Sequence, residues 1–99
     1  MDKLPIEFHP EARAEVLVAF QWYLERSPSA AEAFLQAVAH AEPAICNSPE
    51  TWPEYLHGTR RYLLRRFPFV IVYRVKEHRI EIVAVAHGHR RPGYWSNRL

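Results

Sequence analysis

Cysteine is almost absent from this sequence, in which Cys46 is the only thiol among 99 residues. A single cysteine excludes a disulfide within the chain and cannot build a zinc knuckle. No apolar run approaches the roughly 20 residues that cross a bilayer, and no basic and then apolar leader opens the chain. We therefore expect a cytoplasmic domain that does not associate with membranes.

Lysine is also scarce, because eleven of the 13 basic residues are arginine. Acidic residues become rare in the second half of the chain. Residues 1–56 carry three basic and nine acidic side chains, a net charge of −6, whereas residues 57–99 carry ten basic and two acidic, a net charge of +8. Arginine suits bidentate contacts with phosphate or carboxylate. This asymmetry predicts one basic side that faces an anionic or acidic partner.

The first half of the chain has the pattern of a strand followed by two helices. Residues 4–8 form a short apolar run, and Pro10 suits the first position of a helix that ends at Ser27 and Pro28. Apolar residues then recur every three or four positions, and we assign Trp22 to the core. A second helix is predicted with Ser29 as its N-cap and an interruption at Pro43.

Beyond a loop at residues 47–59, the apolar period changes from 3.6 to 2. Three strands are predicted at residues 60–67, 69–75 and 79–87, joined in an antiparallel meander. Residues 90–99 are too short for more than a tail or one helical turn. The fold class is therefore α+β with the order β-α-α-β-β-β. A helical hairpin packs on one face of a small, mainly antiparallel twisted sheet, and residues 1–99 form a single domain.

Both faces of the predicted sheet are apolar, yet one helical hairpin can cover only one of them. The second face carries four valines, and we expect them to face a partner chain: Val70, Val72, Val83 and Val85. The alternative is that the C-terminal tail folds back over these valines and that Tyr94 and Trp95 anchor it.

The segments "GTRRYLLRRFPFVIVYRV" and "IEIVAVAHGHRRPGYW", with "HPEARAEVLVAFQWY" in the first helix, resemble the RelE/ParE superfamily of toxins from bacterial type II toxin–antitoxin modules. The likeness is closest to the ParE-type, plasmid-stabilisation branch. There a Gly and Arg pair open the second strand, a Phe-Pro reversal follows, and the last strand leads into His-x-x-Arg and Tyr-Trp. The resemblance implies a growth-inhibiting toxin that is neutralised by a co-expressed antitoxin.

Two target chemistries occur in this superfamily. In the RelE-like alternative, the protein is a metal-independent endoribonuclease that cuts mRNA at the ribosome, which requires a base, an acid and cations around the phosphate. The candidate catalytic residues are then His87, His89, Arg90 and Tyr94. RelE-type enzymes rely on lysines in the second strand, and this chain has none between Lys3 and Lys76.

In the ParE-like interpretation, which we favour, the toxin binds DNA gyrase without catalysis of its own. The residues predicted to bind the target or a phosphate are Arg60, Arg61, Arg65, Arg90 and Arg91. Strand alternation places Arg61 and Arg65 on the face opposite Arg60, so these arginines cannot all hold one phosphate.

A nucleic-acid-binding module that is not a toxin is a further alternative. His87 and His89 could pinch a zinc ion, but the nearby sequence offers no third ligand, so we predict no metal and no cofactor.

Overall fold

A short strand leads directly into the first helix. The structure, a computed structural model, describes residues 4–99. Strand β1 (Ile6–Phe8) is followed by helix α1 (Pro10–Arg26). His9 caps this helix, because its Nδ1 accepts a hydrogen bond from the backbone N–H of Glu11 at 3.1 Å. Pro10 occupies the first turn, where a missing N–H is harmless.

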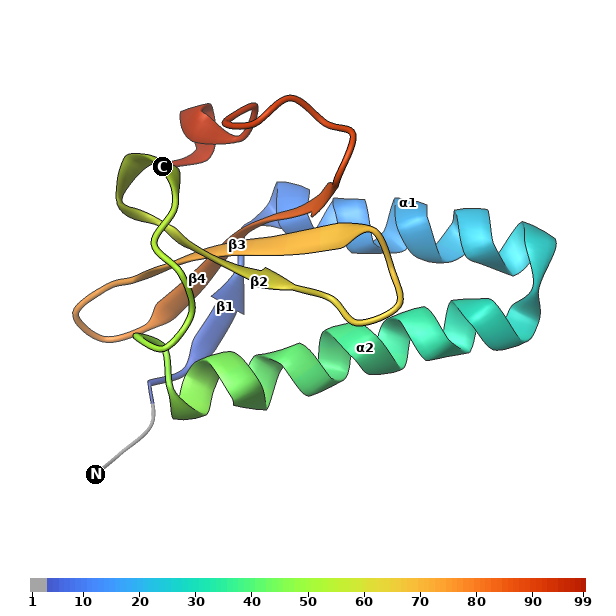
Figure 1. The fold of residues 1–99 in the computed structure, drawn as a ribbon, viewed down its shortest axis with the longest axis horizontal. Helices are drawn as coiled ribbons and strands as arrows, with labels where there is room; N and C mark the ends of the chain where they lie inside the picture. Colours follow the sequence, from blue (N-terminus) through green and yellow to red (C-terminus); the bar gives the residue numbers. More distant parts are fainter. Residues whose placement is uncertain (1–3) are drawn as a thin grey trace.

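Helix α2 (Pro28–Asn47) begins after a single linking residue, Ser27. The Oγ of Ser27 accepts from the N–H of Ala30 at 3.3 Å, so Ser27 is the N-cap and the predicted cap at Ser29 is wrong. Pro28 explains the difference, because it takes the first helical position itself. The helix continues through Pro43 rather than stopping there. The short link makes the two helices an antiparallel hairpin (Figure 1).

Strands β2 (Arg60–Leu63), β3 (Phe69–Val75) and β4 (Ile80–His87) form the predicted meander. The sheet order is β1-β4-β3-β2, with β1 parallel to β4 and the other pairs antiparallel. This arrangement confirms the α+β fold class. Strand β2 is shorter than predicted, because the chain turns before Phe69 and Arg66 has a left-handed φ of 68°. One 3-10 turn, η1 (Leu56–Gly58), precedes β2, and another, η2 (Ser96–Arg98), lies near the C-terminus.

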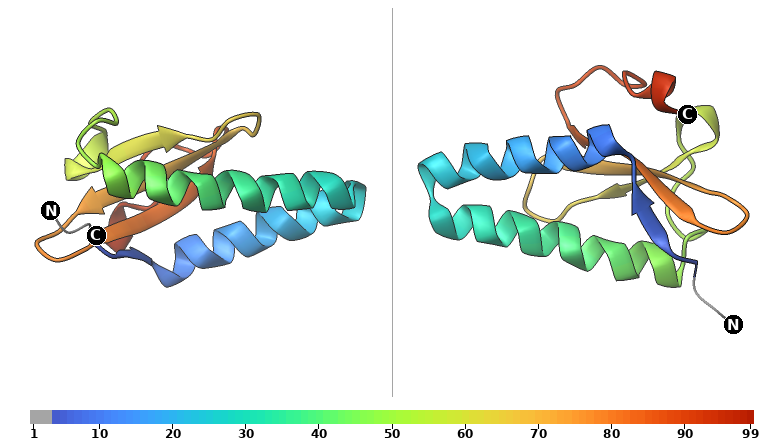
Figure 2. Two further views of the ribbon diagram at one scale, coloured as in Figure 1. Left: turned by 90° about the horizontal axis from the view of Figure 1, so that it is seen from below. Right: turned by 180° about the vertical axis from the view of Figure 1, so that it is seen from behind.

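The helical hairpin covers one face of the sheet and forms the main core with it (Figure 2). At its centre Phe34 is fully buried between Tyr23 of α1 and the rings of Phe67 and Phe69. The prediction that Trp22 belongs to this core is wrong, because its exposed fraction is 51%. Ile71, Tyr73, Ile80 and Ile82 supply the sheet side of the core.

A β-bulge changes which residues of β4 face the helices. Val72 pairs with Ala84 and Tyr73 pairs with Ile82, so Val83 is the extra residue. Beyond the bulge the alternation is reversed, and Val85 packs in the helix-side core beside its partner Ile71. The prediction that Val85 lies on the second face is therefore wrong.

The second face is covered by the chain's own C-terminal segment, residues 88–99 (red in Figure 1). Trp95 is 1% exposed and packs against Val72, Val83 and Ala84. Val70 lies at the margin of this cluster and is half-buried. The valines are thus not an open surface for an antitoxin, and that prediction is wrong. The alternative, in which the tail folds back over the sheet, is confirmed.

Candidate functional site

The outer edge of β4 has no neighbouring strand beyond β1, and two side chains satisfy its backbone groups there. Strand β1 accompanies β4 only as far as Ile82. Past that point the N–H of Val85 donates to Oε1 of Glu15 on α1 at 2.9 Å, and Nη1 of Arg98 donates to the carbonyl of Val83 at 3.0 Å. Glu15 and Arg98 therefore connect the first helix and the C-terminal segment to the open part of this edge.

Glu15 is also the acceptor for two side chains of the C-terminal segment. Nη1 and Nη2 of Arg98 donate to its two carboxylate oxygens at 3.1 and 2.9 Å, and the hydroxyl of Tyr94 donates to Oε2 at 2.6 Å. Burial, and then the hydrogen bond and charge of Glu15, raise the pKa of Tyr94. Burial acts to lower the pKa of Arg98, but the hydrogen bond and charge of Glu15 leave it raised. Both groups are thus held in their protonated forms.

A largely apolar groove of about 640 Å³ lies between α1, the ends of β3 and β4, and the C-terminal segment. Helix α1 contributes Ala14, Val18 and Trp22, and the sheet contributes Phe69 and Val85. His87, Arg90, Arg98, Glu11 and Glu15 supply the polar lining. No role for α1 at this groove was predicted. The feature of the sequence that could have indicated one is that apolar residues occur all around this helix rather than on one stripe.

His87 and His89 lie together at the end of β4, as the sequence suggested. Their ring centroids are 4.9 Å apart, and His87 also meets the ring of Phe69 edge-on at 5.2 Å. The Nδ1 of His87 accepts a hydrogen bond from the backbone N–H of His89 at 3.1 Å. This ring nitrogen is therefore occupied within the turn, which leaves Nε2 as the ring nitrogen of His87 that can face another molecule.

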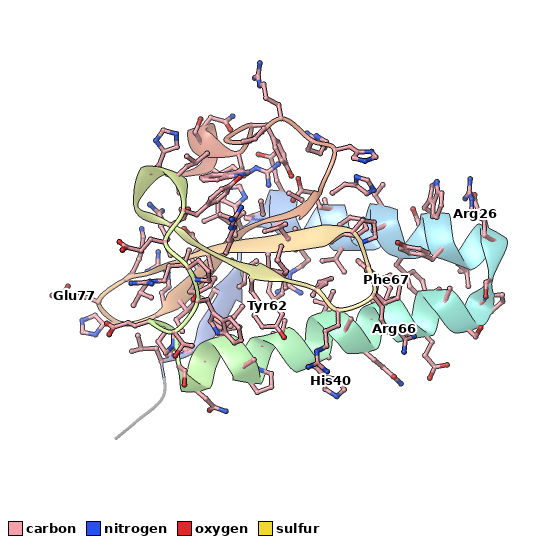
Figure 3. All side chains as sticks on the ribbon, in the orientation of Figure 1. Arg26, His40, Tyr62, Arg66, Phe67 and Glu77 are labelled. Atoms are coloured by element: carbon pink, nitrogen blue, oxygen red, sulfur yellow. The ribbon has the colours of Figure 1, made fainter. Side chains whose placement is uncertain are left out.

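The arginines around β2 are not gathered at one site. Arg60 points to the helix face and donates to the carbonyl of Trp52 at 2.7 Å, whereas Arg61 lies on the opposite face over the ring of Tyr55. Arg65 is not on a strand, because β2 ends at Leu63. Arg65 and Arg66 belong to the turn that reaches the helices (Figure 3). The predicted split of Arg60 and Arg61 between the two faces is present, whereas Arg65 lies outside the strand, where alternation does not apply.

Arg90 and Arg91 are exposed in the C-terminal segment. The guanidinium of Arg90 stacks 3.9 Å above the centroid of the Tyr94 ring. Neither arginine is in an ion pair within residues 4–99, whereas Arg74 pairs with Glu81 and Arg79 pairs with Glu7. The two arginines thus leave their charge available to another molecule.

No group of three metal-ligating side chains occurs among the residues that the structure describes. Over the same part of the chain, no helix is long and apolar enough to span a membrane. The geometry thus places two exposed arginines in the segment that borders a largely apolar groove.

Comparisons with known proteins point to one family. Residues 6–92 match the family model described as "ParE toxin of type II toxin-antitoxin system, parDE". Among solved structures, the chain resembles one from a structure described as "Chromosomal ParDE TA system from P. aeruginosa". The two chains are 24% identical with a TM-score of 0.73, and the match covers 86% of this chain and 96% of that one. No curated protein matches the chain.

Proposed function

The chain belongs to the ParE toxin family of type II toxin–antitoxin systems, and we propose that it inhibits growth by binding DNA gyrase. The observation that supports a binding toxin over a ribonuclease is that two of the four predicted catalytic side chains, His87 and Tyr94, are hydrogen-bonded within the fold. Tyr94 donates to Glu15, and the Nδ1 of His87 accepts from the backbone of His89. A general acid works best with a pKa near the working pH, and the raised pKa of Tyr94 moves away from it.

In this proposal, Arg90 and Arg91 are the contact with the target. Both are exposed and neither has a carboxylate partner within residues 4–99. The guanidinium of Arg90 stacks on the ring of Tyr94. Unpaired arginines at a segment that projects from the sheet attract an acidic protein surface or a phosphate backbone, and both are present in gyrase on DNA.

The experiment is a supercoiling assay with purified gyrase, read also for trapped cleaved DNA. We expect the wild type to inhibit supercoiling and the variant Arg90→Ala/Arg91→Ala to need about tenfold more protein, equivalent to about 1.4 kcal/mol of binding free energy. The matched control is Lys76→Ala/Arg79→Ala, which removes two cations at the β3–β4 hairpin and should leave inhibition unchanged. Intact supercoiling together with cleavage of a reporter mRNA would replace gyrase with RNA as the target.

We further propose that the antitoxin binds across the outward surface of α1. Leu17, Val18 and Trp22 are 55%, 65% and 51% exposed there, although all three are large and apolar. The 640 Å³ groove lies on one side of this ridge. A second apolar hollow of about 600 Å³, lined by Leu17, Phe20 and Leu35 among others, lies on the other side. A ridge between two hollows suits an amphipathic helix of the antitoxin.

This surface is tested by Val18→Asp, with Leu63→Asp as the matched control. Both side chains are 65% exposed, but Leu63 lies on the other face of the sheet. Val18→Asp should weaken binding of the co-purified antitoxin by about tenfold or more, because it places a charge against an apolar partner. Equal antitoxin affinity for the two variants would exclude α1 as the binding surface.

A further inference from the structure

The C-terminal segment is attached to the rest of the molecule almost entirely by side chains. Within the described residues, its one main-chain hydrogen bond to a residue distant in the sequence runs from the N–H of Gly88 to the carbonyl of Pro68 at 2.7 Å. Its other main-chain hydrogen bonds are local, each joining residues three apart: Arg90 to His87, Tyr94 to Arg91, Ser96 to Gly93, Arg98 to Trp95 and Leu99 to Ser96. A segment held this way keeps its position only if its side-chain anchors hold.

Glu15 is the polar anchor. Its carboxylate accepts from Tyr94, from both terminal nitrogens of Arg98 and from the N–H of Val85. The Glu15 and Arg98 side chains are 16% and 8% exposed, so water competes little for this bidentate pair. Because Arg98 also donates to Val83, the anchor joins α1, β4 and the C-terminal segment at one point.

Tyr94 connects the anchor Glu15 to Arg90, which is predicted to contact the target. The hydroxyl of Tyr94 is fixed on Glu15, and the ring of Tyr94 carries the guanidinium of Arg90 at 3.9 Å. Tyr94, Trp95 and Arg98 all lie beyond residue 92, where the match to the family model ends. Glu15 and Arg90 lie within the matched residues, so the anchor joins residues on both sides of the point where the match ends.

We propose that Glu15 is a positioning residue for target binding, which acts through Tyr94 to hold Arg90 in its binding orientation. This inference rests on the proposed function, in which Arg90 and Arg91 contact the target. A segment that is already ordered loses little conformational entropy on binding, whereas a loose segment must be ordered by the target. Removal of the Glu15 charge also leaves the buried Arg98 with only the more exposed Glu11, at 3.7 Å, as a carboxylate partner, which favours release of the segment.

The test is a double-mutant cycle between Glu15→Gln and Arg90→Ala, measured as the protein concentration that half-inhibits gyrase. Glu15→Gln alone should raise this concentration by about tenfold. In the Arg90→Ala background it should add less than about twofold, because the group it positions is already gone. If the two substitutions raise the half-inhibiting concentration by factors that multiply in the double variant, Glu15 has only a general structural role and the proposal is overturned.

The matched control is Glu81→Gln. The Glu81 side chain is also 16% exposed and pairs with an arginine, Arg74, at 2.8 Å, but it lies at the other end of β4. Glu81→Gln should leave inhibition unchanged, and equal losses in the two variants would overturn the proposal. Amide hydrogen exchange should become faster at residues 88–99 in Glu15→Gln only, and unchanged exchange there would equally contradict it.

A variant that does not fold, or a wild type without effect on gyrase, still leaves the role of Glu15 testable. If Glu15→Gln does not fold, Tyr94→Phe replaces it in the cycle, because it deletes the hydrogen bond to Glu15 and keeps the ring on which Arg90 stacks. If the wild type does not act on gyrase, the gyrase proposal alone fails. The same variants are then compared by growth inhibition in cells, and the same additivity criterion decides the role of Glu15.

Discussion

The two faces of the sheet are buried by different means. On the helix face, α1 and α2 supply a broad core in which Phe34 contacts aromatic rings from three other elements of the chain. On the second face, Trp95 covers Val72, Val83 and Ala84, and Tyr55 and Tyr94 pack against the same cluster. The helices carry their own backbone hydrogen bonds, whereas the segment that presents Trp95 is held by its side chains. The core on the helix face should thus determine the global free energy of unfolding. The second face should instead open locally, by release of the C-terminal segment.

The largest effect should follow from Phe34→Ala, which removes the centre of the helix-face core. Phe34 is fully buried, so the substitution should lower the free energy of unfolding by about 4 kcal/mol. Urea denaturation measures this loss. The neighbouring Leu35→Ala, at a side chain 41% exposed, serves as the control and should lose far less. A loss for Phe34→Ala below that for Trp95→Ala would reverse the ranking of the two faces.

Trp95→Ala should lower the free energy of unfolding by about 3 kcal/mol, the low end of the range for such truncations. The loss is smaller because the thin C-terminal segment can collapse partly onto the valines. Hydrogen exchange should rise first at residues 88–99, with the helices still protected. Simultaneous loss of protection in α2 would show that the two faces unfold together.

Tyr94→Phe should cost about 1 kcal/mol, because it deletes one hydrogen bond to Glu15. It should also change the response to alkali. Burial and Glu15 raise the pKa of Tyr94 above its ordinary value of 10.0, so above pH 10 the unfolded chain loses the proton first and stability falls as pH rises.

The helix face has a comparable group in Tyr73, whose pKa burial raises to about 12. Denaturation curves between pH 9 and about 12 should fall for the wild type and fall less steeply for Tyr94→Phe and for Tyr73→Phe. Curves that are identical for all three proteins would contradict the assignment of buried phenols on both faces.

The smallest effect should follow from Leu63→Thr. Leu63 is 65% exposed on the second face, beyond the cover of Trp95. The substitution keeps a residue that favours strands, so the free energy of unfolding should change by less than about 0.5 kcal/mol. A larger loss in urea denaturation would mean that the C-terminal segment covers more of the second face than Trp95 reaches.

The elements themselves were predictable, because each leaves a local pattern. The change of apolar period near residue 60 predicted the helices and the meander, and the order of the last three strands followed from their short connections. The prediction of Ser29 as the N-cap was wrong because serines flank Pro28 on both sides. Since Pro28 takes the first helical position, Ser27 is the cap. Strand β2 ended early because Arg66 adopts a left-handed turn that no residue preference required.

The candidate site was predicted only in part. The histidines and the exposed arginines after β4 were found, since they are adjacent in the sequence. Glu15 was missed, because its partners Tyr94 and Arg98 are 79 and 83 positions away. Val85 was placed on the wrong face because alternation of period 2 assumes a regular strand, and the bulge at Val83 reverses it.

The sequence by itself determined which segments become helices and strands, their fold class and the excess of positive charge after residue 56. These properties depend on hydrophobic period, caps and charge counts, all of which act between near neighbours along the chain. Only the tertiary structure decided that the chain covers its own second face and that a carboxylate on α1 holds the cover. That choice depends on contacts between the two ends of the chain, for which the local pattern carries no information.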